Sequence, residues 1–338
     1  MKAVIRPHPL PIADPKSLVD AELPKPAPAG RDLLVKVEAV SVNPVDTKRR
    51  MVREESGEPR VLGWDAAGTV EAIGPGVTLF KPGDEVYYAG DVGRPGSNSE
   101  FQLVDERIVG GKPKSLDFAQ AAAMPLTAIT AWESFFDRMK IDRHGKSRGA
   151  RILIIGGAGG VGSIGIQLAR LAGLTVVATA SRPETREWVK KLGAHHVIDH
   201  RQALKAQAEA IGFRHFEYIA NFSGDLDQHW PAMGELIAPQ GYCVAIVGNQ
   251  KPMPLDAMRM KSASFCWEFM FTRPRFQTPD MIEQHRLLNE VAALLDAGTL
   301  KCTLRETLSP ISAANLRAAH ARLESGTMIG KLALKGWS

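Results

Sequence analysis

Apolar residues in the first part of the chain fall into short stretches separated by proline and glycine. Strands are expected where these stretches are rich in β-branched and apolar residues, at residues 2–6, 32–42, 68–73, 85–88 and 100–104. A pattern with helical spacing follows over residues 119–138. The chain is therefore predicted to begin with a β-rich region.

From residue 151 onward, short apolar runs alternate with amphipathic segments. This alternation predicts a doubly wound α/β region, in which helices cover both faces of a parallel sheet. Ser312 is a plausible cap for the helix expected directly after it. Further strands are expected at residues 175–180, 197–198, 218–222, 241–247 and 331–334, and helices at 184–192, 284–295 and 312–324.

The segment RILIIGGAGGVG, residues 151–162, has the form of a buried strand that turns on glycine into a helix. Gly157, Gly159 and Gly162 fit the G-x-G-x-x-G pattern, in which the first glycine permits the turn. The second allows a pyrophosphate to approach and the third allows the helix to pack closely on the strand. Ala158, Gly160 and Val161 complete this turn, so the segment predicts a dinucleotide site.

The residues after the next expected strand bear on the choice of cofactor. An acidic residue there binds the ribose 2′-hydroxyl of NAD, but this chain has Ser181 and Arg182. A hydroxyl and a guanidinium suit the 2′-phosphate of NADPH, which is the predicted cofactor. The alternative is that Ser181 only caps the following helix and that Arg182 is solvated, and the nearby Glu184 argues against NADPH.

Length and composition narrow the class of protein. A chain of 338 residues exceeds the size at which one hydrophobic core keeps growing, so two domains are expected. We expect a cytoplasmic protein without a membrane segment, because long apolar runs and a signal peptide are absent and the three cysteines are widely spaced. The net charge of +5 is spread among interleaved acidic and basic residues, so no nucleic-acid partner is expected.

Three further segments, GWDAAGTVEAIGPGV, FKPGDEVYYAG and MPLTAITAWE, together with the glycine turn, carry a family resemblance. The chain resembles the medium-chain dehydrogenase/reductase superfamily over nearly its whole length. Within it, the chain is most similar to the quinone oxidoreductase branch and to bacterial zinc-type alcohol dehydrogenase-like proteins. The resemblance implies a GroES-like catalytic domain at residues 1–126 and 300–338 and a Rossmann NADPH-binding domain at 127–299, with the nicotinamide in the cleft between them.

The zinc ligands of the superfamily are missing from this sequence. Asn43 stands where zinc alcohol dehydrogenases have cysteine, and Gly63-Trp64-Asp65 stands in place of Gly-His-Glu. Residues 90–115, where a four-cysteine zinc lobe is expected, contain no cysteine. The adjacent His195 and His196 are interpreted as structural. No metal is therefore predicted.

By resemblance, Asn43 and Asp46 line the catalytic side of the cleft. Asn43 is predicted to donate a hydrogen bond and Asp46 to hold Asn43 and its backbone in place, although both residues also suit an ordinary turn. Thr127 matches a threonine near the nicotinamide, with a bond to its own helix backbone as the alternative. Lys48 and Arg50 are further candidates for reaching the substrate oxygen.

Other candidates surround the cofactor and the substrate. Asn221, Ser223, Gly248 and Asn249 follow two later strands and are predicted to contact the cofactor. His200 stands where related quinone reductases have a tyrosine. The apolar run at residues 265–271 is expected to wall the substrate pocket or to cover a second subunit of a homodimer. The predicted pocket residues of this kind are Trp64, Tyr88, Phe269 and Phe271, with Tyr87 as an alternative to Tyr88.

Without a Lewis acid, a simple alcohol loses the group that polarises its oxygen. A quinone or an α,β-unsaturated carbonyl spreads the arriving charge by itself. The sequence therefore predicts a zinc-independent, NADPH-dependent oxidoreductase that transfers hydride to such an acceptor. The alternatives are a zinc-type alcohol dehydrogenase and a non-enzymatic NADPH-binding protein.

Overall fold

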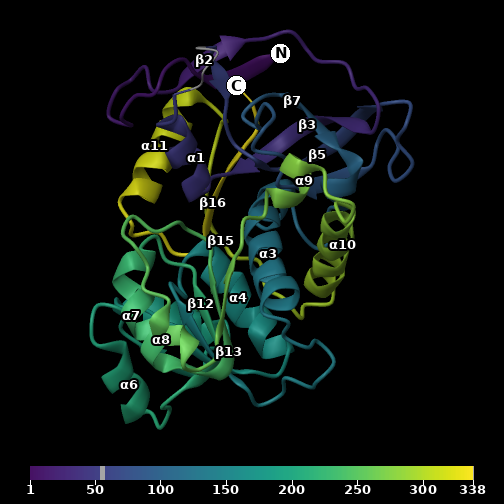
Figure 1. Ribbon diagram of the computed structural model, residues 1–338. Coiled ribbons are helices and arrows are strands. Elements are labelled where there is room, and N and C mark those ends of the chain that lie inside the picture. The colour runs from purple at the N-terminus through teal and green to yellow at the C-terminus, as the bar shows by residue number, and fades with distance from the viewer. Residues whose placement is uncertain (54–57, 338) are drawn as a thin grey trace. The chain divides into compact units, whose positions relative to one another are not determined.

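A computed structural model describes residues 1–53 and 58–337 (Figure 1). The chain divides into two compact units. The first unit comprises Met1–Ile129 and Phe271–Ser338, and the second unit comprises Thr130–Met270. None of the helices within the described ranges is long and apolar enough to span a bilayer.

The first unit is built on a largely antiparallel sheet of seven strands. Its order is β15-β16-β3-β5-β6-β8, and β7 pairs with β3 outside this path. The strands are β3 (Asp32–Ser41), β5 (Asp65–Ile73), β6 (Glu85–Tyr88), β7 (Phe101–Asp105), β8 (Val109–Gly111), β15 (Leu304–Leu308) and β16 (Lys331–Lys335). A second small sheet contains β1 (Lys2–Arg6), β2 (Val19–Glu22) and β4 (Arg60–Val61). The expected β-rich region is confirmed.

The register of the large sheet determines which polar residues share a face. Ser41, the last residue of β3, pairs with Asp65 at the start of β5 and with Ala333 on β16. Because side chains alternate along a strand, these three residues lie on one face. Continuing β3 and β16 by two residues brings Asn43 opposite Lys331 on that same face. The register thus gathers polar residues at one end of the sheet.

The second unit is an α/β domain with a parallel sheet of six strands in the order β11-β10-β9-β12-β13-β14. The strands are β9 (Arg151–Ile155), β10 (Thr175–Thr179), β11 (His196–Ile198), β12 (Phe216–Asn221), β13 (Ile237–Ala245) and β14 (Ser264–Trp267). The helices between them include α4 (Gly160–Leu171), α5 (Pro183–Lys191), α6 (Leu204–Ala210), α7 (Leu226–Leu236) and α8 (Asp256–Arg259). This order confirms the doubly wound Rossmann arrangement.

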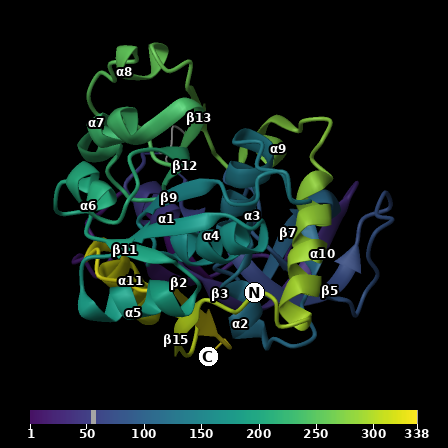
Figure 2. The same cartoon turned by 90° about the horizontal axis from the view of Figure 1, so that it is seen from below.

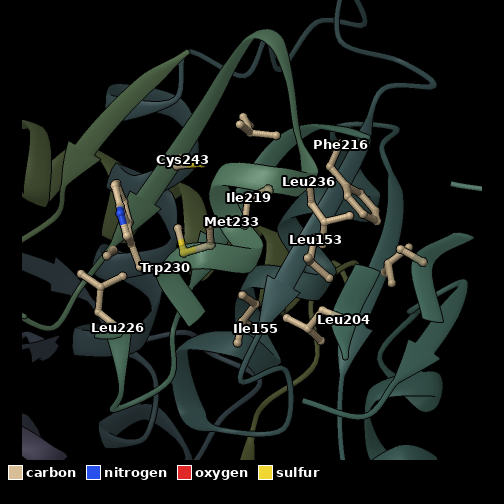
Figure 3. Close-up of a cluster of buried hydrophobic side chains, with 14 of the residues drawn as sticks. Leu153, Ile155, Leu204, Phe216, Ile219, Leu226, Trp230, Met233, Leu236 and Cys243 are labelled. Atoms are coloured by element: carbon tan, nitrogen blue, oxygen red, sulfur yellow. The ribbon is translucent and has the colours of Figure 1, made fainter. Parts of the chain in front are cut away.

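Both faces of this sheet are covered. Helix α4 packs on β9 and β10, and α5 packs on β11 (Figure 2). On the other face, α7 contributes Trp230, Met233 and Leu236 to a core that also contains Leu153 and Ile219 from the strands (Figure 3). Alternate residues of the central strands are buried on opposite faces, which explains their nearly continuous apolar runs.

The helical pattern at residues 119–138 is divided into three segments. They are α2 (Phe118–Ala122), α3 (Pro125–Trp132) and a π-helical turn at Glu133–Arg138. Pro125 begins the second segment because proline lacks an N–H group and is tolerated only in the first turn of a helix. Helices α1 (Pro44–Arg50), α9 (Thr272–Phe276) and α11 (Ala313–Glu324) complete the set used below, and Ser312 caps α11 as expected.

The helix α10 (Glu283–Asp296) belongs to the first unit, whereas the sequence placed all of residues 127–299 in the nucleotide-binding domain. Tyr87 Oη donates to Leu288 O of α10 at 2.5 Å. A Cβ on Gly110 of β8 would lie only 2.6 Å from Leu288 Cβ, so glycine permits this close packing. The contact division therefore moves residues 271–299 to the first unit, because this amphipathic helix buries its apolar face against β8.

Candidate active site

The glycine turn lies between β9 and α4 of the second unit. Gly156 has a φ of +84°, a conformation that favours glycine, so the sharp turn belongs to this residue rather than to Gly157 as the sequence suggested. A Cβ on Gly162 would approach Gly156 O to 2.3 Å, which agrees with the predicted close packing of helix and strand. Gly159 is the N-cap of α4 and supplies no side-chain cap, so the first amides of the helix keep their hydrogen-bonding capacity for an anion.

The residues after β10 carry more charge than the sequence motif alone indicated. Arg182 is the N-cap of α5, and its N–H donates to Thr185 Oγ1 at 3.0 Å. Ser181 is therefore not the cap of this helix. The Arg182 Nε lies 3.1 Å from Glu184 Oε1, so the acidic neighbour partly neutralises the guanidinium.

A further arginine, which follows the neighbouring parallel strand β11, contacts the residues after β10. Arg201 Nη2 donates to Ser181 O at 2.9 Å and pairs with Asp199 at 2.8 Å. Arg186 also donates to Ala180 O at 3.3 Å. Sequence reasoning missed Arg201, although its position just after β11 places it at the carboxyl edge of the sheet, where nucleotides bind.

The other predicted cofactor residues follow the carboxyl ends of parallel strands. Asn221, at the end of β12, is buried and its Oδ1 accepts from both the N–H and the Oγ of Ser223, at 3.0 and 2.7 Å. Gly248 and Asn249 are exposed after β13, which ends at Ala245, two residues earlier than expected. Burial lowers the pKa of the half-buried His200, which follows β11. These residues all border the edge of the sheet that the glycine turn occupies.

A buried polar cluster lies at the end of the large sheet in the first unit. Asn43 is the N-cap of α1, and its backbone N–H donates to Asp46 Oδ2 at 2.7 Å. Burial raises the pKa of Asp46 to about 7, against the opposing effects of the Asn43 hydrogen bond and of Lys331. Asp46 thus holds the backbone at Asn43, as the sequence analysis suggested for it.

Lys331, a residue that sequence reasoning missed, lies at the centre of this cluster. Its ammonium donates to Asn43 Oδ1 at 2.5 Å, to Val42 O at 2.9 Å and to Asp65 Oδ2 at 3.0 Å. The Lys331 side chain is only 3% exposed and that of Asp65 is fully buried. The only sequence signal was a lysine at the start of an apolar strand, where a charge is unusual.

The contacts of Asn43 determine the orientation of its amide. Its Nδ2 donates to Asp65 Oδ2 at 2.8 Å, and its Oδ1 faces the Lys331 ammonium. Reversing the amide would place an oxygen against a carboxylate and a nitrogen against an ammonium, so the assignment follows from the charges. The second Nδ2 hydrogen has only a long contact of 3.4 Å to Ser41 O.

Thr127 is joined to the same cluster through its neighbour. Asp65 Oδ1 accepts from the N–H of Leu126, the residue before Thr127, at 2.8 Å. The hydroxyl of Thr127 donates to Met124 O at 3.1 Å, which is the helix-backbone bond that was its alternative. The buried Thr127 therefore lies next to the cluster in the chain, while its hydroxyl is directed to its own helix.

The cluster does not suit a zinc ion. The ligand positions hold a neutral amide, an indole and one carboxylate, and a lysine ammonium lies within 3.0 Å of both Asn43 Oδ1 and Asp65 Oδ2. A divalent cation would be repelled by that ammonium, and one carboxylate falls short of the three or four protein ligands that zinc takes. Residues 1–53 and 58–337 contain no group of three or more His, Cys, Asp or Glu arranged to hold a metal.

His195 and His196 have structural contacts. The His195 Nδ1 accepts from Val176 N at 2.9 Å, and the His196 ring meets Phe213 edge-on at 5.2 Å. Both rings therefore support β10 and β11.

The predicted substrate-pocket residues differ in their burial, in the sheet face on which they lie and in the unit to which they belong. Trp64 is buried, donates from Nε1 to Asp91 O at 3.0 Å and meets the buried Phe271 edge-on. Tyr88 pairs with Ala66, so the register places it on the opposite face of the sheet from Asp65. Burial raises the pKa of Tyr88. Phe269 is 43% exposed and belongs to the second unit.

The two basic candidates on α1 also differ. Lys48 is exposed, whereas Arg50 is buried. Arg50 donates to Leu10 O at 3.1 Å and to Glu324 at 2.5 Å, and it contacts His320 Nδ1. These contacts attach α1 to α11 and already use the Arg50 guanidinium.

Comparison with known proteins identifies the family. Residues 29–124 match the alcohol dehydrogenase GroES-like domain, and residues 160–285 match the zinc-binding dehydrogenase family. A zinc-type alcohol dehydrogenase-like protein of Staphylococcus aureus (strain MSSA476) is 47% identical over 312 residues, which are 92% of each chain. The chain belongs to the medium-chain dehydrogenase/reductase superfamily. It is an oxidoreductase of the zinc-type alcohol dehydrogenase-like group.

Two other similarities add detail. A crystal structure from Rhizobium etli CFN 42, whose name places it among zinc-dependent alcohol dehydrogenases, is 55% identical with a TM-score of 0.96 and covers 100% of this chain and 98% of its own. The 2-methylene-furan-3-one reductase of Solanum lycopersicum is 42% identical over 180 residues, 50% of this chain and 44% of its own. The names of these similar proteins thus include both alcohol dehydrogenases and a 2-methylene-furan-3-one reductase.

Proposed function

We propose that this protein is an NADPH-dependent, metal-independent reductase that transfers hydride to a quinone or an α,β-unsaturated carbonyl. The observation that carries the proposal is the hydrogen-bonded pair of Asn43 and Asp65 at the positions of the superfamily's metal ligands, 2.8 Å apart. The two side chains offer hydrogen bonds, and Lys331 balances the charge of Asp65, but none of these groups is a Lewis acid. The reaction must therefore suit an acceptor that is already activated.

A conjugated acceptor meets that requirement. NADPH, when bound, would supply the hydride. The negative charge reaching the acceptor would be delocalised onto its oxygen, and a proton from water would complete the reduction. The protein needs only to position the acceptor and to offer donors to that oxygen. The Solanum relative is named for a substrate that contains a C=C bond conjugated to a ketone, which supports this class.

We propose NADPH as the cofactor because arginines converge after β10. Arg182 and Arg201 flank Ser181, and each is paired with one carboxylate, Glu184 and Asp199 respectively. A 2′-phosphate carries about two negative charges near neutral pH, so it can compete with these carboxylates for the partly exposed guanidinium groups. NADH lacks that phosphate and would leave the existing ion pairs undisturbed.

We further propose a cytoplasmic homodimer. Strand β14 is the edge of the parallel sheet, and Trp267 at its end and Phe269 two residues later are 46% and 43% exposed. A sheet edge with exposed aromatic residues suits a second copy of this chain. Light scattering of the purified protein at micromolar concentration tests this, and a monomer mass would contradict it.

The experiment that tests the function is a screen of NADPH oxidation against quinones, enals, enones and simple ketones, with metal analysis of the same protein. We expect turnover with conjugated acceptors only, unchanged activity in strong chelator and no stoichiometric zinc. Reduction of simple ketones together with one bound zinc per chain would favour an alcohol dehydrogenase. Tight NADPH binding without turnover of any acceptor would favour a non-enzymatic NADPH-binding protein.

A further inference from the structure

The Lys331 ammonium is fully engaged by the protein. An ammonium has three N–H donors, and the structure provides three acceptors within 3.0 Å: Asn43 Oδ1, Val42 O and Asp65 Oδ2. All three donors are thus used before a substrate oxygen arrives. The role of Lys331 must therefore be exerted through the groups that it binds.

Those groups belong to segments that are far apart in the sequence. Val42 and Asn43 follow β3, Asp65 begins β5 and Lys331 begins β16. The β3 ladder ends at Ser41, which pairs with Asp65 and Ala333, and one further backbone bond runs from Val42 N to Leu332 O at 3.1 Å. Backbone pairing therefore reaches Val42 but does not define the Asn43 side chain. The ammonium joins the three segments at the point where the ladder stops.

We propose that Lys331 is a positioning residue that fixes the Asn43 amide, at the position of one of the superfamily's metal ligands, with its Oδ1 toward the ammonium. This inference rests on the proposed function, in which Asn43 serves the reaction. A single ammonium balances the single Asp65 carboxylate, whereas a divalent ion at this place would leave an excess positive charge. The lysine thus maintains the geometry without acting as a Lewis acid.

The orientation of Asn43 is the property that separates positioning from simple stabilisation. With Lys331 present, Asn43 Oδ1 faces the ammonium and Nδ2 faces Asp65. In a Lys331→Met, Asp65→Asn double variant, the charges are gone and the amide introduced at position 65 can donate to Asn43 Oδ1. The network then closes again with the Asn43 amide reversed.

The experiment compares Lys331→Met, Lys331→Arg, the double variant and Lys335→Met as a matched control. Lys335 lies on the same strand but is exposed. For each variant, turnover with an accepted acceptor, NADPH affinity, thermal unfolding and hydrogen exchange of the peptide over residues 41–50 are measured. NADPH affinity checks that the second unit is folded.

We expect Lys331→Met to lower the unfolding temperature, to speed exchange over residues 41–50 and to reduce turnover about tenfold to a hundredfold, because small displacements of catalytic groups have effects of that size. Lys331→Arg should retain part of the turnover, because it keeps the charge. The double variant should recover the unfolding temperature but not the turnover. Lys335→Met should behave as the wild type in every measurement.

Recovery of both stability and turnover in the double variant would overturn the positioning role, since Lys331 would then only stabilise the sheet. Unchanged exchange and turnover in Lys331→Met would overturn it as well. If the wild-type protein reduces no acceptor at all, the proposed function fails, and the exchange data still show whether Lys331 holds the segment after β3. The two failures are therefore distinguishable.

Discussion

Each unit of this protein buries a group of charged side chains, and the two groups are neutralised by different means. In the first unit, the Asp65 carboxylate is matched by the Lys331 ammonium at 3.0 Å. In the second unit, two buried carboxyl groups, Glu133 and Glu268, lie together, and Arg138 Nε donates to Glu268 at 2.9 Å. Burial and the hydrogen-bonded neighbour Glu133 raise the pKa of Glu268 to about 9.

The two clusters differ in what neutralises them. In the first it is a lysine side chain, and in the second it is a proton shared by two carboxyl groups. The positive charge that neutralises the first cluster belongs to the Lys331 side chain. Only a mutation of that residue removes it. Glu268 pairs with Arg138 and is hydrogen-bonded to Glu133, and its raised pKa keeps a proton in this cluster near neutral pH, so the second cluster depends on pH. Glu133 and Glu268 also lie close in sequence to the unit boundaries at Thr130 and Met270. We therefore expect mutation to disturb the first unit most and pH to disturb the second.

Replacing Asp65 by asparagine should have the largest effect. The buried Lys331 ammonium would lose the carboxylate with which it is paired, and breaking such a pair costs about 3–5 kcal/mol of unfolding free energy. Calorimetry or urea unfolding measures the loss. As a control, Glu71→Gln removes an exposed partner of Lys25 and should leave the unfolding free energy nearly unchanged. A similar small change in both variants would mean that the two kinds of pair are equivalent.

Glu268→Gln should alter the pH dependence of stability. The folded protein keeps the Glu268 proton up to about pH 9, whereas the unfolded chain loses it near the ordinary pKa of 4.5. The contribution of this group is complete below that lower value and declines as the pH rises toward 9, by at most about 1.4 kcal/mol per pH unit.

A glutamine at 268 cannot lose a proton, so the stability of the variant relative to the wild type should improve steadily between pH 5 and 9. Unfolding curves at several pH values measure the difference. Glu133→Gln should act in the same direction, since its amide can donate where the shared proton was. Parallel pH profiles for wild type and both variants would contradict the shared proton.

Asn43→Ala should lower turnover more than it lowers NADPH affinity. It removes the proposed donor and one acceptor of Lys331, and because the acceptor delocalises its own charge, we expect a loss of about 1–2 kcal/mol of transition-state stabilisation, less than in a demanding oxyanion site. Steady-state kinetics should show turnover reduced about tenfold. Unchanged turnover on every accepted substrate would remove Asn43 from the catalytic assignment.

The smallest effects on stability are expected at the partly exposed arginines of the second unit, where binding should change instead. Arg182→Ala and Arg201→Ala should each weaken NADPH binding about tenfold, leave NADH binding unaffected and leave the unfolding free energy nearly unchanged. Arg214→Ala, just before β12 at the opposite end of the strands, is the control and should alter neither affinity. Equal weakening of both cofactors in titrations would contradict a 2′-phosphate site.

Local patterns in the sequence were sufficient for much of this description. The glycine turn after β9 and the cap at Ser312 depend on residues within a few positions of each other, and both were predicted. So was the alternation of strands and helices, because apolar periodicity is a property of one segment at a time. The link between Asn43 and Asp46 also spans only three positions. For these features, the sequence contains the physical cause.

Other features were decided only by the tertiary structure. Lys331 contacts Asn43 across 288 positions of the chain, and only the register of β16 on β3 brings the two residues together. Arg201 reaches Ser181 because β10 and β11 are parallel neighbours, and α10 joins the first unit because Gly110 leaves room for Leu288. Sequence patterns thus determined which elements form, whereas strand pairing and packing decided which distant charges meet.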